Sequence, residues 1–179
     1  MVYLFLAEGF EEAEAVAPAD ILRRAGAEVR LVGVGGLLVK GAHGIGITAD
    51  LKQDEAEKEG LEMIVLPGGM PGTANLENDA VVQGLIEYAY EKGLWIGAIC
   101  AAPSILGHKG FLKGKKAVCY PGYEKDLEGA RVLKTATCED GNIITANGPG
   151  AAMEFGILLA SKLKGTGRSS QIRNSMMMK

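Results

Sequence analysis

The sequence has few of the residues on which disulfide scaffolds, zinc sites and histidine-dependent active sites rely. Its 179 residues include three cysteines, two histidines, six prolines and one tryptophan. The cysteines are odd in number and widely spaced, which excludes a disulfide framework, and no Cys-x-x-Cys pair is present for zinc. We therefore expect free thiols, no metal and no bound cofactor.

Long hydrophobic runs and a strong charge of one sign are also missing. No apolar segment reaches the roughly 18 residues of a membrane span, and the N-terminal residues lack the basic region and cleavage site of a signal peptide. The net charge is -3, and the densest basic cluster, KGKK at residues 113–116, is typical of a solvated turn. We therefore expect a cytoplasmic protein that binds neither nucleic acid nor membrane.

Length and composition favour one globular domain over residues 1–179. Hydrophobic residues make up 47% of the chain and charged residues 23%, which is enough to build a core without staples. The 26 glycines lie between apolar runs, so they predict tight turns and close backbone approaches rather than disorder.

The apolar runs alternate with helical patterns. We expect strands at 2–7, 28–34, 61–66, 94–99 and 143–146, shorter strands at 116–120 and 131–137, and a hairpin within 35–48. Helices are expected at 11–25, 51–59, 78–92, 101–107 and 151–163; Pro18 either delays or kinks the first, and residues 165–179 form a short helix or fray. This order predicts an α/β fold with a parallel sheet covered by helices on both faces, and sites at the carboxyl ends of its strands.

Cys100 lies at one of these strand ends, between the run LWIGAI and a short helix. A tight turn there presents the side chain as a nucleophile elbow does, and a helix N-terminus lowers a thiol pKa. The alternative is a small buried hydrophobe. Of the two histidines, His108 lies about 12 Å further along the helix, too far for a proton relay, so a carboxylate is the expected partner.

Two other strand ends carry candidate groups. In the LPGG stretch the N–H of Gly69, together with that of Ala101, is placed to form an oxyanion hole, although a plain turn explains the glycines equally well. The first helix starts with three acidic residues, Glu11, Glu12 and Glu14. The helix dipole alone would explain why acidic residues are found there. A glutamate held against the cysteine in an apolar pocket would have a raised pKa and could move a proton.

Four motifs together resemble the DJ-1/PfpI superfamily, and within it the branch of small DJ-1-like and ThiJ-like proteins. They are GFEEAEAVAPADILRRAG, IVLPGGMPGTANL, GAICAAP and ANGPGAAMEFGI, in this order along nearly the whole chain. The resemblance implies a flavodoxin-like three-layer sandwich and a homodimer. It makes Cys100 the reactive cysteine and Glu14 the protonated glutamate beside it, with Gly69 and Ala101 as backbone donors, and it places Arg24 in an anion-friendly pocket near the dimer interface.

The chain departs from the family pattern at several pocket positions. Tyr120 stands where many relatives have a histidine, and His43 where some carry an arginine. Ala101 occupies the position at which the protease-like branch has a histidine, which argues against a peptidase. The pocket expected from the resemblance therefore contains Gly68, Arg24, His43 and Tyr120.

The resemblance implies an enzyme that acts through Cys100 on small reactive carbonyls, for example a glutathione-independent glyoxalase that converts methylglyoxal to lactate, or a deglycase. The alternative is a redox-sensing or chaperone-like stress protein with an oxidisable cysteine. A role in thiamine biosynthesis is a weaker alternative, because no phosphate-binding glycine pattern is present. We expect Cys119 and Cys138 to be ordinary strand-borne thiols and Trp95 to be a core residue.

Overall fold

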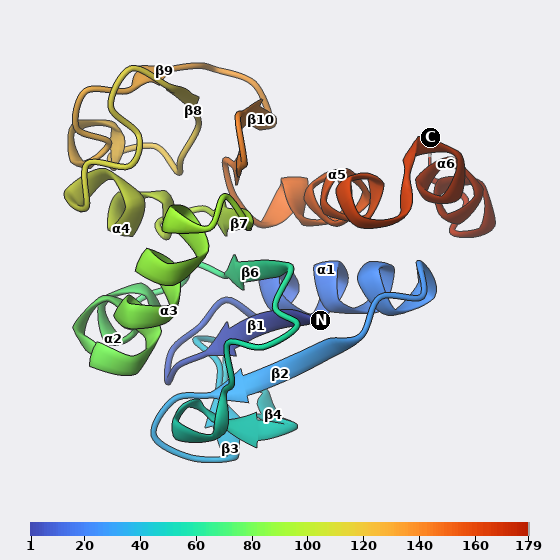
Figure 1. Cartoon of the computed structure of the whole chain (residues 1–179), viewed down its shortest axis with the longest axis horizontal. Helices are drawn as coiled ribbons and strands as arrows, with labels where there is room; N and C mark the ends of the chain where they lie inside the picture. The colour runs from blue at the N-terminus through green and yellow to red at the C-terminus, as the bar shows by residue number, and fades with distance from the viewer. Residues whose placement is uncertain (179) are drawn as a thin grey trace.

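The computed structural model describes residues 1–178 and centres on one mixed sheet (Figure 1). Seven strands pair in the order β10-β11-β7-β6-β1-β2-β5, and every pair is parallel except β10 with β11. Their bounds are β1 Val2–Leu6, β2 Val29–Gly33, β5 Leu51–Lys52, β6 Met63–Leu66, β7 Trp95–Ile99, β10 Thr137–Asp140 and β11 Ile143–Ala146. The predicted mostly parallel sheet is confirmed.

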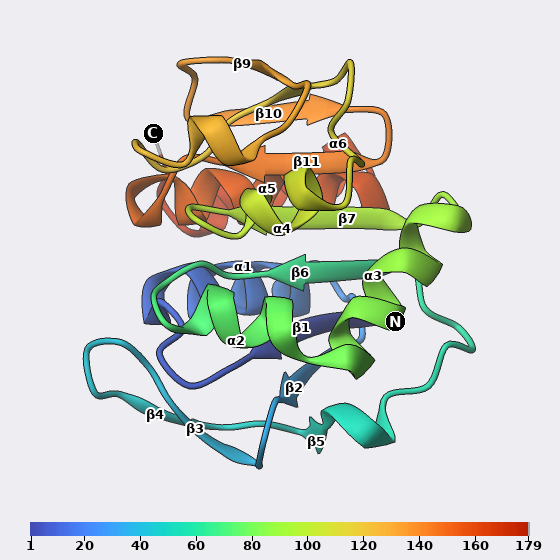
Figure 2. The same cartoon turned by 90° about the vertical axis from the view of Figure 1, so that its left-hand side faces the viewer.

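Helices cover both faces of this sheet (Figure 2). One layer contains α1 Glu12–Arg24, α5 Ala152–Lys164 and α6 Thr166–Ser175, and the other α2 Gly72–Asn78, α3 Ala80–Glu91 and α4 Pro103–His108. Side chains of β1 alternate between the two cores, Leu4 and Leu6 packing on the α1 side and Tyr3 and Phe5 on the α3 side. The three-layer α/β fold class is confirmed.

Two predicted segments have a different structure. Residues 51–59 form the edge strand β5 and a 3-10 helix, η1 Gln53–Glu55, because Leu51 pairs with Val32 of β2. The helix expected at 78–92 begins later, where the Asp79 side chain accepts the N–H groups of Val81 and Val82. No pattern in the sequence indicated α2, which follows directly on the glycine loop.

The C-terminal third also departs from expectation. The strands expected at 116–120 and 131–137 are only two residues long each, β8 Lys116–Ala117 and β9 Arg131–Val132, and form a separate parallel pair. The strand β10 belongs to the main sheet. The predicted hairpin is present as β3 Leu38–Lys40 and β4 Gly46–Thr48. In the tail α6 forms, and Lys179 lies outside the described residues. The remaining elements are η2 Glu124–Asp126 and η3 Pro149–Ala151.

The parallel sheet places the carboxyl ends of β1, β6 and β7 side by side at one edge. The segments that follow these strands are the start of α1, the loop beginning at Pro67, and Cys100. Among residues 1–178, no helix is both long enough and apolar enough to cross a membrane.

Candidate active site

Cys100 occupies a strained turn at the end of β7. Its φ is 66°, a left-handed conformation that residues other than glycine rarely adopt. The backbone is held on both sides: the Cys100 N–H donates to the Ala146 carbonyl at 2.9 Å, and the Cys100 carbonyl accepts the Tyr120 N–H at 2.8 Å. The side chain is partly exposed. The expected elbow geometry is therefore present, with strain of the kind found at functional sites.

Glu14, in the first turn of α1, lies against this cysteine. Its side chain is fully buried, Oε2 accepts the Gly68 N–H at 2.8 Å, and the carboxyl shares a hydrogen bond with the Cys100 side chain. Among the described residues, Oε1 has no hydrogen-bond partner. A Cβ on Gly68 would lie 2.6 Å from the Cys100 Cβ and 2.7 Å from Glu14 Oε2, so only glycine fits between the two.

Burial sets the protonation of both groups. It raises the pKa of Glu14 to about 7, against the lowering effect of the hydrogen bonds from Gly68 and Cys100. Burial, followed by the charge of Glu14, raises the pKa of the Cys100 thiol to about 12, and the hydrogen bonds from Gly69 and Ala101 only partly offset this. The expected lowering of the thiol pKa by the helix N-terminus is therefore wrong, because desolvation outweighs a helix of only six residues.

The two pKa values assign the groups different tasks. Near neutral pH, Cys100 keeps its proton while Glu14 is partly ionised. A Glu14 carboxylate beside the thiol can accept its proton as the sulfur attacks an electrophile. In that step Glu14 acts as the base, and afterwards it holds a proton next to the new adduct.

Gly69 and Ala101 bring two backbone donors to Cys100. Both N–H groups hydrogen-bond to the cysteine side chain, and their role as an oxyanion hole stays a prediction. Gly69 has φ 88°, and a Cβ there would lie 2.4 Å from the Glu11 nitrogen, so the loop passes too close to α1 for any side chain. Two N–H groups converging beside a sulfur are suited to stabilising negative charge that develops there.

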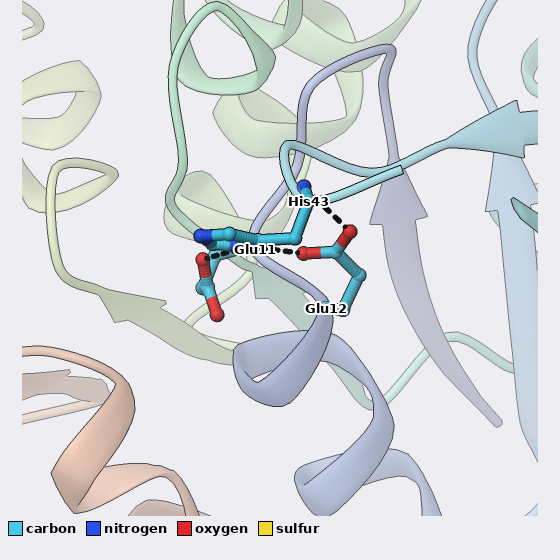
Figure 3. A group of neighbouring side chains, drawn as sticks. All are labelled: Glu11, Glu12 and His43. Carbon is cyan, nitrogen blue, oxygen red and sulfur yellow. Dashed lines mark hydrogen bonds and ion pairs between the residues drawn. The ribbon is translucent and has the colours of Figure 1, made fainter. Parts of the chain in front are cut away.

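His43 lies outside the Cys100–Glu14 pair, over the start of α1 (Figure 3). Its Nδ1 is 2.9 Å from Glu12 Oε2 and 3.2 Å from Glu11 Oε2. Glu12 Oε1 accepts the backbone N–H groups of His43 at 2.8 Å and of Ile45 at 3.3 Å. Burial acts to raise the Glu12 pKa, but these hydrogen bonds together hold it below its ordinary value. Sequence reasoning missed this pairing, because the residues are 31 positions apart.

The other predicted pocket residues, Tyr120 and Arg24, make different contacts from His43. Tyr120 is bonded to Cys100 through its backbone, and its half-exposed ring packs beside Gly148. Arg24 is not brought to Cys100 within the chain: it ends α1, about 15 Å along the axis from Glu14, and its Nε pairs with Asp20 at 2.8 Å.

One group in the described part of the chain has metal-ligand spacing. Ligand atoms of Glu11, Glu12 and His43 lie within 4.8 Å of one another. The imidazole already pairs with both carboxylates, which accounts for the spacing, and we assign no metal there.

The remaining singled-out residues are structural. Cys138 lies on β10 as expected, whereas Cys119 follows β8 and is not on a strand; both are buried. Trp95 begins β7 and packs against the core on the α1 side, with Lys162 Nζ 5.7 Å from its ring centroid.

The DJ-1/PfpI family profile matches residues 1–162. The chain belongs to this family. Protein dj-1beta of Drosophila melanogaster is 33% identical over 97% of this chain and 95% of that protein. The solved structure of oxidized Toxoplasma gondii DJ-1 superposes with a TM-score of 0.94 at 32% identity, covering 98% of this chain and 97% of that one.

Two relatives are named for an activity. Glutathione-independent glyoxalase DJR-1.2 of Caenorhabditis elegans is 30% identical, covering 92% of this chain and 89% of that protein. Deglycase PH1704 of Pyrococcus horikoshii is 32% identical, covering 83% and 91%. The chain spans only 41% of Protein DJ-1 homolog B of Arabidopsis thaliana, to which it is 34% identical. DJ-1 family membership and the possibility of an enzyme activity are thereby supported.

Proposed function

We propose that this protein is a cysteine-dependent, glutathione-independent glyoxalase-type enzyme that converts methylglyoxal to lactate. The observation that carries the proposal is the buried Glu14 carboxyl against the Cys100 thiol, flanked by the N–H groups of Gly69 and Ala101. The names of the nematode and archaeal relatives point to the same class of small carbonyl substrates. Repair of glycated amines or thiols would use the same groups.

The first step forms a carbon–sulfur bond. Glu14 takes the thiol proton as the Cys100 sulfur attacks the aldehyde carbon, and the carbonyl electron pair moves onto the oxygen. The Gly69 and Ala101 N–H groups stabilise the resulting hemithioacetal oxyanion. The strained elbow leaves the Cys100 side chain partly exposed, so that a small aldehyde can approach the sulfur.

The later steps need no external oxidant. Glu14 first returns the thiol proton to the hemithioacetal oxygen and is a carboxylate again. It then takes the proton from the former aldehyde carbon and delivers it to the neighbouring carbonyl carbon, while the hydroxyl proton passes to the second oxygen, so the first carbon is oxidised and the second is reduced. The adduct becomes a thioester of lactate. Water then attacks the thioester, releases lactate and restores the thiol, and the net reaction is the addition of one water molecule to methylglyoxal.

A redox role for the same cysteine is the second candidate. The partial exposure of the Cys100 side chain favours it, because an oxidant can reach the sulfur. The raised thiol pKa argues against rapid oxidation, since the thiolate is the reactive form. Glu14→Gln separates the two roles: an enzyme loses turnover, whereas a sensor only changes its rate of oxidation.

We also propose a homodimer, as the family resemblance implies. Exposed apolar side chains on α1 and around the β3–β4 hairpin, among them Val16, Leu38 and Ile45, are consistent with a covered face. Light scattering on the purified protein gives the mass of the assembly directly, and a monomer at micromolar concentration would contradict the proposal.

The experiment that tests the function is lactate formation from methylglyoxal by the purified protein without glutathione. Turnover that is lost in both Cys100→Ser and Glu14→Gln would support the enzyme and both roles. No turnover in the wild type, with Cys100 still oxidised readily by peroxide, would reject the glyoxalase and favour the redox role.

A further inference from the structure

A continuous set of contacts joins the exposed His43 to the buried Cys100. His43 Nδ1 pairs with Glu11 and Glu12 at 3.2 and 2.9 Å. The Glu11 backbone N–H donates to the Gly68 carbonyl at 2.9 Å, and the Gly68 N–H donates to Glu14 Oε2 at 2.8 Å. Three contacts therefore connect the imidazole on the surface to the Glu14 carboxyl beside Cys100.

The loop carrying His43 is fitted closely to α1. A Cβ on Gly41 would lie 2.3 Å from Glu12 Oε1, and the Ala42 N–H donates to the Phe10 carbonyl at 2.8 Å. The carboxylate of Glu12, a residue only 6% exposed, thus accepts two backbone hydrogen bonds from this loop and pairs with the His43 ring. This fit fixes the imidazole over the first turn of α1 (Figure 3).

His43 supplies a positive charge opposite two glutamates. Glu11 and Glu12 face it from α1, with Glu14 one turn deeper, and the charge of Glu11 acts on Glu14. Glu8 and Lys40 flank the same loop, where Glu8 Oε2 accepts the Lys40 N–H at 3.4 Å. The contact with Glu12, together with the charges of both glutamates, raises the pKa of His43, which favours its charged form.

We propose that His43 is a positioning residue for the Cys100–Glu14 pair, whose positive charge balances Glu11 and Glu12 and so sets the pH at which Glu14 ionises. The inference deepens the proposed function, because it names a control on the same base. It does not depend on the identity of the substrate, since it concerns the protonation of the pair itself.

The proposal predicts shifts of opposite sign for two neighbouring substitutions. In His43→Gln the carboxylates of Glu11 and Glu12 lose their counter-charge. Glu14 therefore keeps its proton to higher pH, and we expect its midpoint to rise by about half a pH unit. In Glu11→Gln one repelling charge is removed, so Glu14 ionises at lower pH. His43→Arg keeps the positive charge and should leave the midpoint as in the wild type.

The experiment is the rate of Cys100 alkylation by iodoacetamide from pH 5 to 9, read at the Cys100 peptide by mass spectrometry. Alkylation needs no turnover, so it reports the pair even if methylglyoxal is not a substrate. His108→Gln is the matched control, because His108 also pairs with a carboxylate, Glu77 at 2.5 Å, but on the face formed by α2 and α4. Circular dichroism of each variant checks that the fold is retained.

The expected result is a wild-type midpoint near 7 that rises in His43→Gln, falls in Glu11→Gln and stays in His43→Arg and His108→Gln. An unshifted midpoint in His43→Gln, an equal shift in His108→Gln, or a wild-type profile without a transition in this range would overturn the inference. Shifted alkylation midpoints without any lactate formation would reject the glyoxalase and leave the role of His43 standing.

Discussion

Two thiols of this chain, the partly exposed Cys100 and the buried Cys119, differ most in the groups that surround the sulfur. Desolvation raises the pKa of both, to about 12 for Cys100 and about 11 for Cys119. Cys100 also has a left-handed backbone, two N–H donors and the Glu14 carboxyl, whose pKa is about 7, so that it is partly ionised near neutral pH. The charges acting on Cys119, from Glu124 and Asp126, only raise its pKa further. The two sites therefore differ in whether a proton acceptor lies against the thiol, as Glu14 does at Cys100.

The largest effect should come from removing the sulfur at each of these positions. Cys100→Ser should lower methylglyoxal turnover at least about a thousandfold, because the attacking atom is replaced by a much weaker nucleophile. Cys119→Ser should leave turnover within about twofold of the wild type, since Glu124 and Asp126 act on this sulfur only through their charges and neither is hydrogen-bonded to it. Comparable losses in both variants would show that the contrast between the two thiols is not functional.

Glu14→Gln should lower turnover about a hundredfold or more, because the amide cannot accept the thiol proton. In the wild type, turnover should fall as the pH drops below about 7, where Glu14 becomes protonated and stops acting as the base. That acid limb should disappear in the variant. Steady-state rates from pH 5 to 9 measure both effects, and an acid limb that persists in Glu14→Gln would assign it to another group.

The same glutamate should make folding stability depend on pH. Its pKa rises from 4.5 to about 7 on folding. The folded state therefore holds the proton more tightly, and stability falls as the pH rises from 4.5 through 7. The loss amounts to about 3 kcal/mol.

Urea unfolding of the wild type and Glu14→Gln at pH 5 and pH 8 isolates this contribution. The variant should gain relative to the wild type at pH 8. Glu12→Gln is the control of opposite sign, because the pKa of Glu12 is lowered on folding and its carboxylate contributes stability above the ordinary pKa. If the free energies of unfolding of the wild type and Glu14→Gln differed by the same amount at pH 5 and at pH 8, Glu14 would not be desolvated as described.

The smallest effect is steric and concerns two glycines. Gly68→Ala places a methyl group against Cys100 and Glu14, and we expect a loss of about 1–3 kcal/mol of stability together with reduced turnover. Gly84→Ala on α3 meets nothing within 4 Å and should stabilise the helix by about 0.5–1 kcal/mol. Thermal unfolding and rates of the two variants compare the crowded and the open position; a neutral Gly68→Ala would show that the site tolerates separation of its two groups.

Local patterns sufficed for much of the fold. The apolar runs that became β1 and β7 and the glycines of the loop after β6 were readable, because buried parallel strands leave continuous apolar stretches. Helix α2 and strand β5 were not, since both depend on packing against the sheet rather than on periodicity of their own. The place of Arg24 near a dimer interface stays a prediction, because it depends on a second chain; within the chain its side chain pairs with Asp20 on its own helix.

The sequence by itself determined the order of the main strands and helices, the turn at Cys100 and the candidates beside it, because these follow from patterns of neighbouring residues. Only the tertiary structure decided that Glu14, 54 residues before Gly68, meets both this glycine and Cys100, and that His43 closes over the start of α1. The structure also decided the direction of the Cys100 pKa. Desolvation depends on what packs around a group, and no local pattern specifies that.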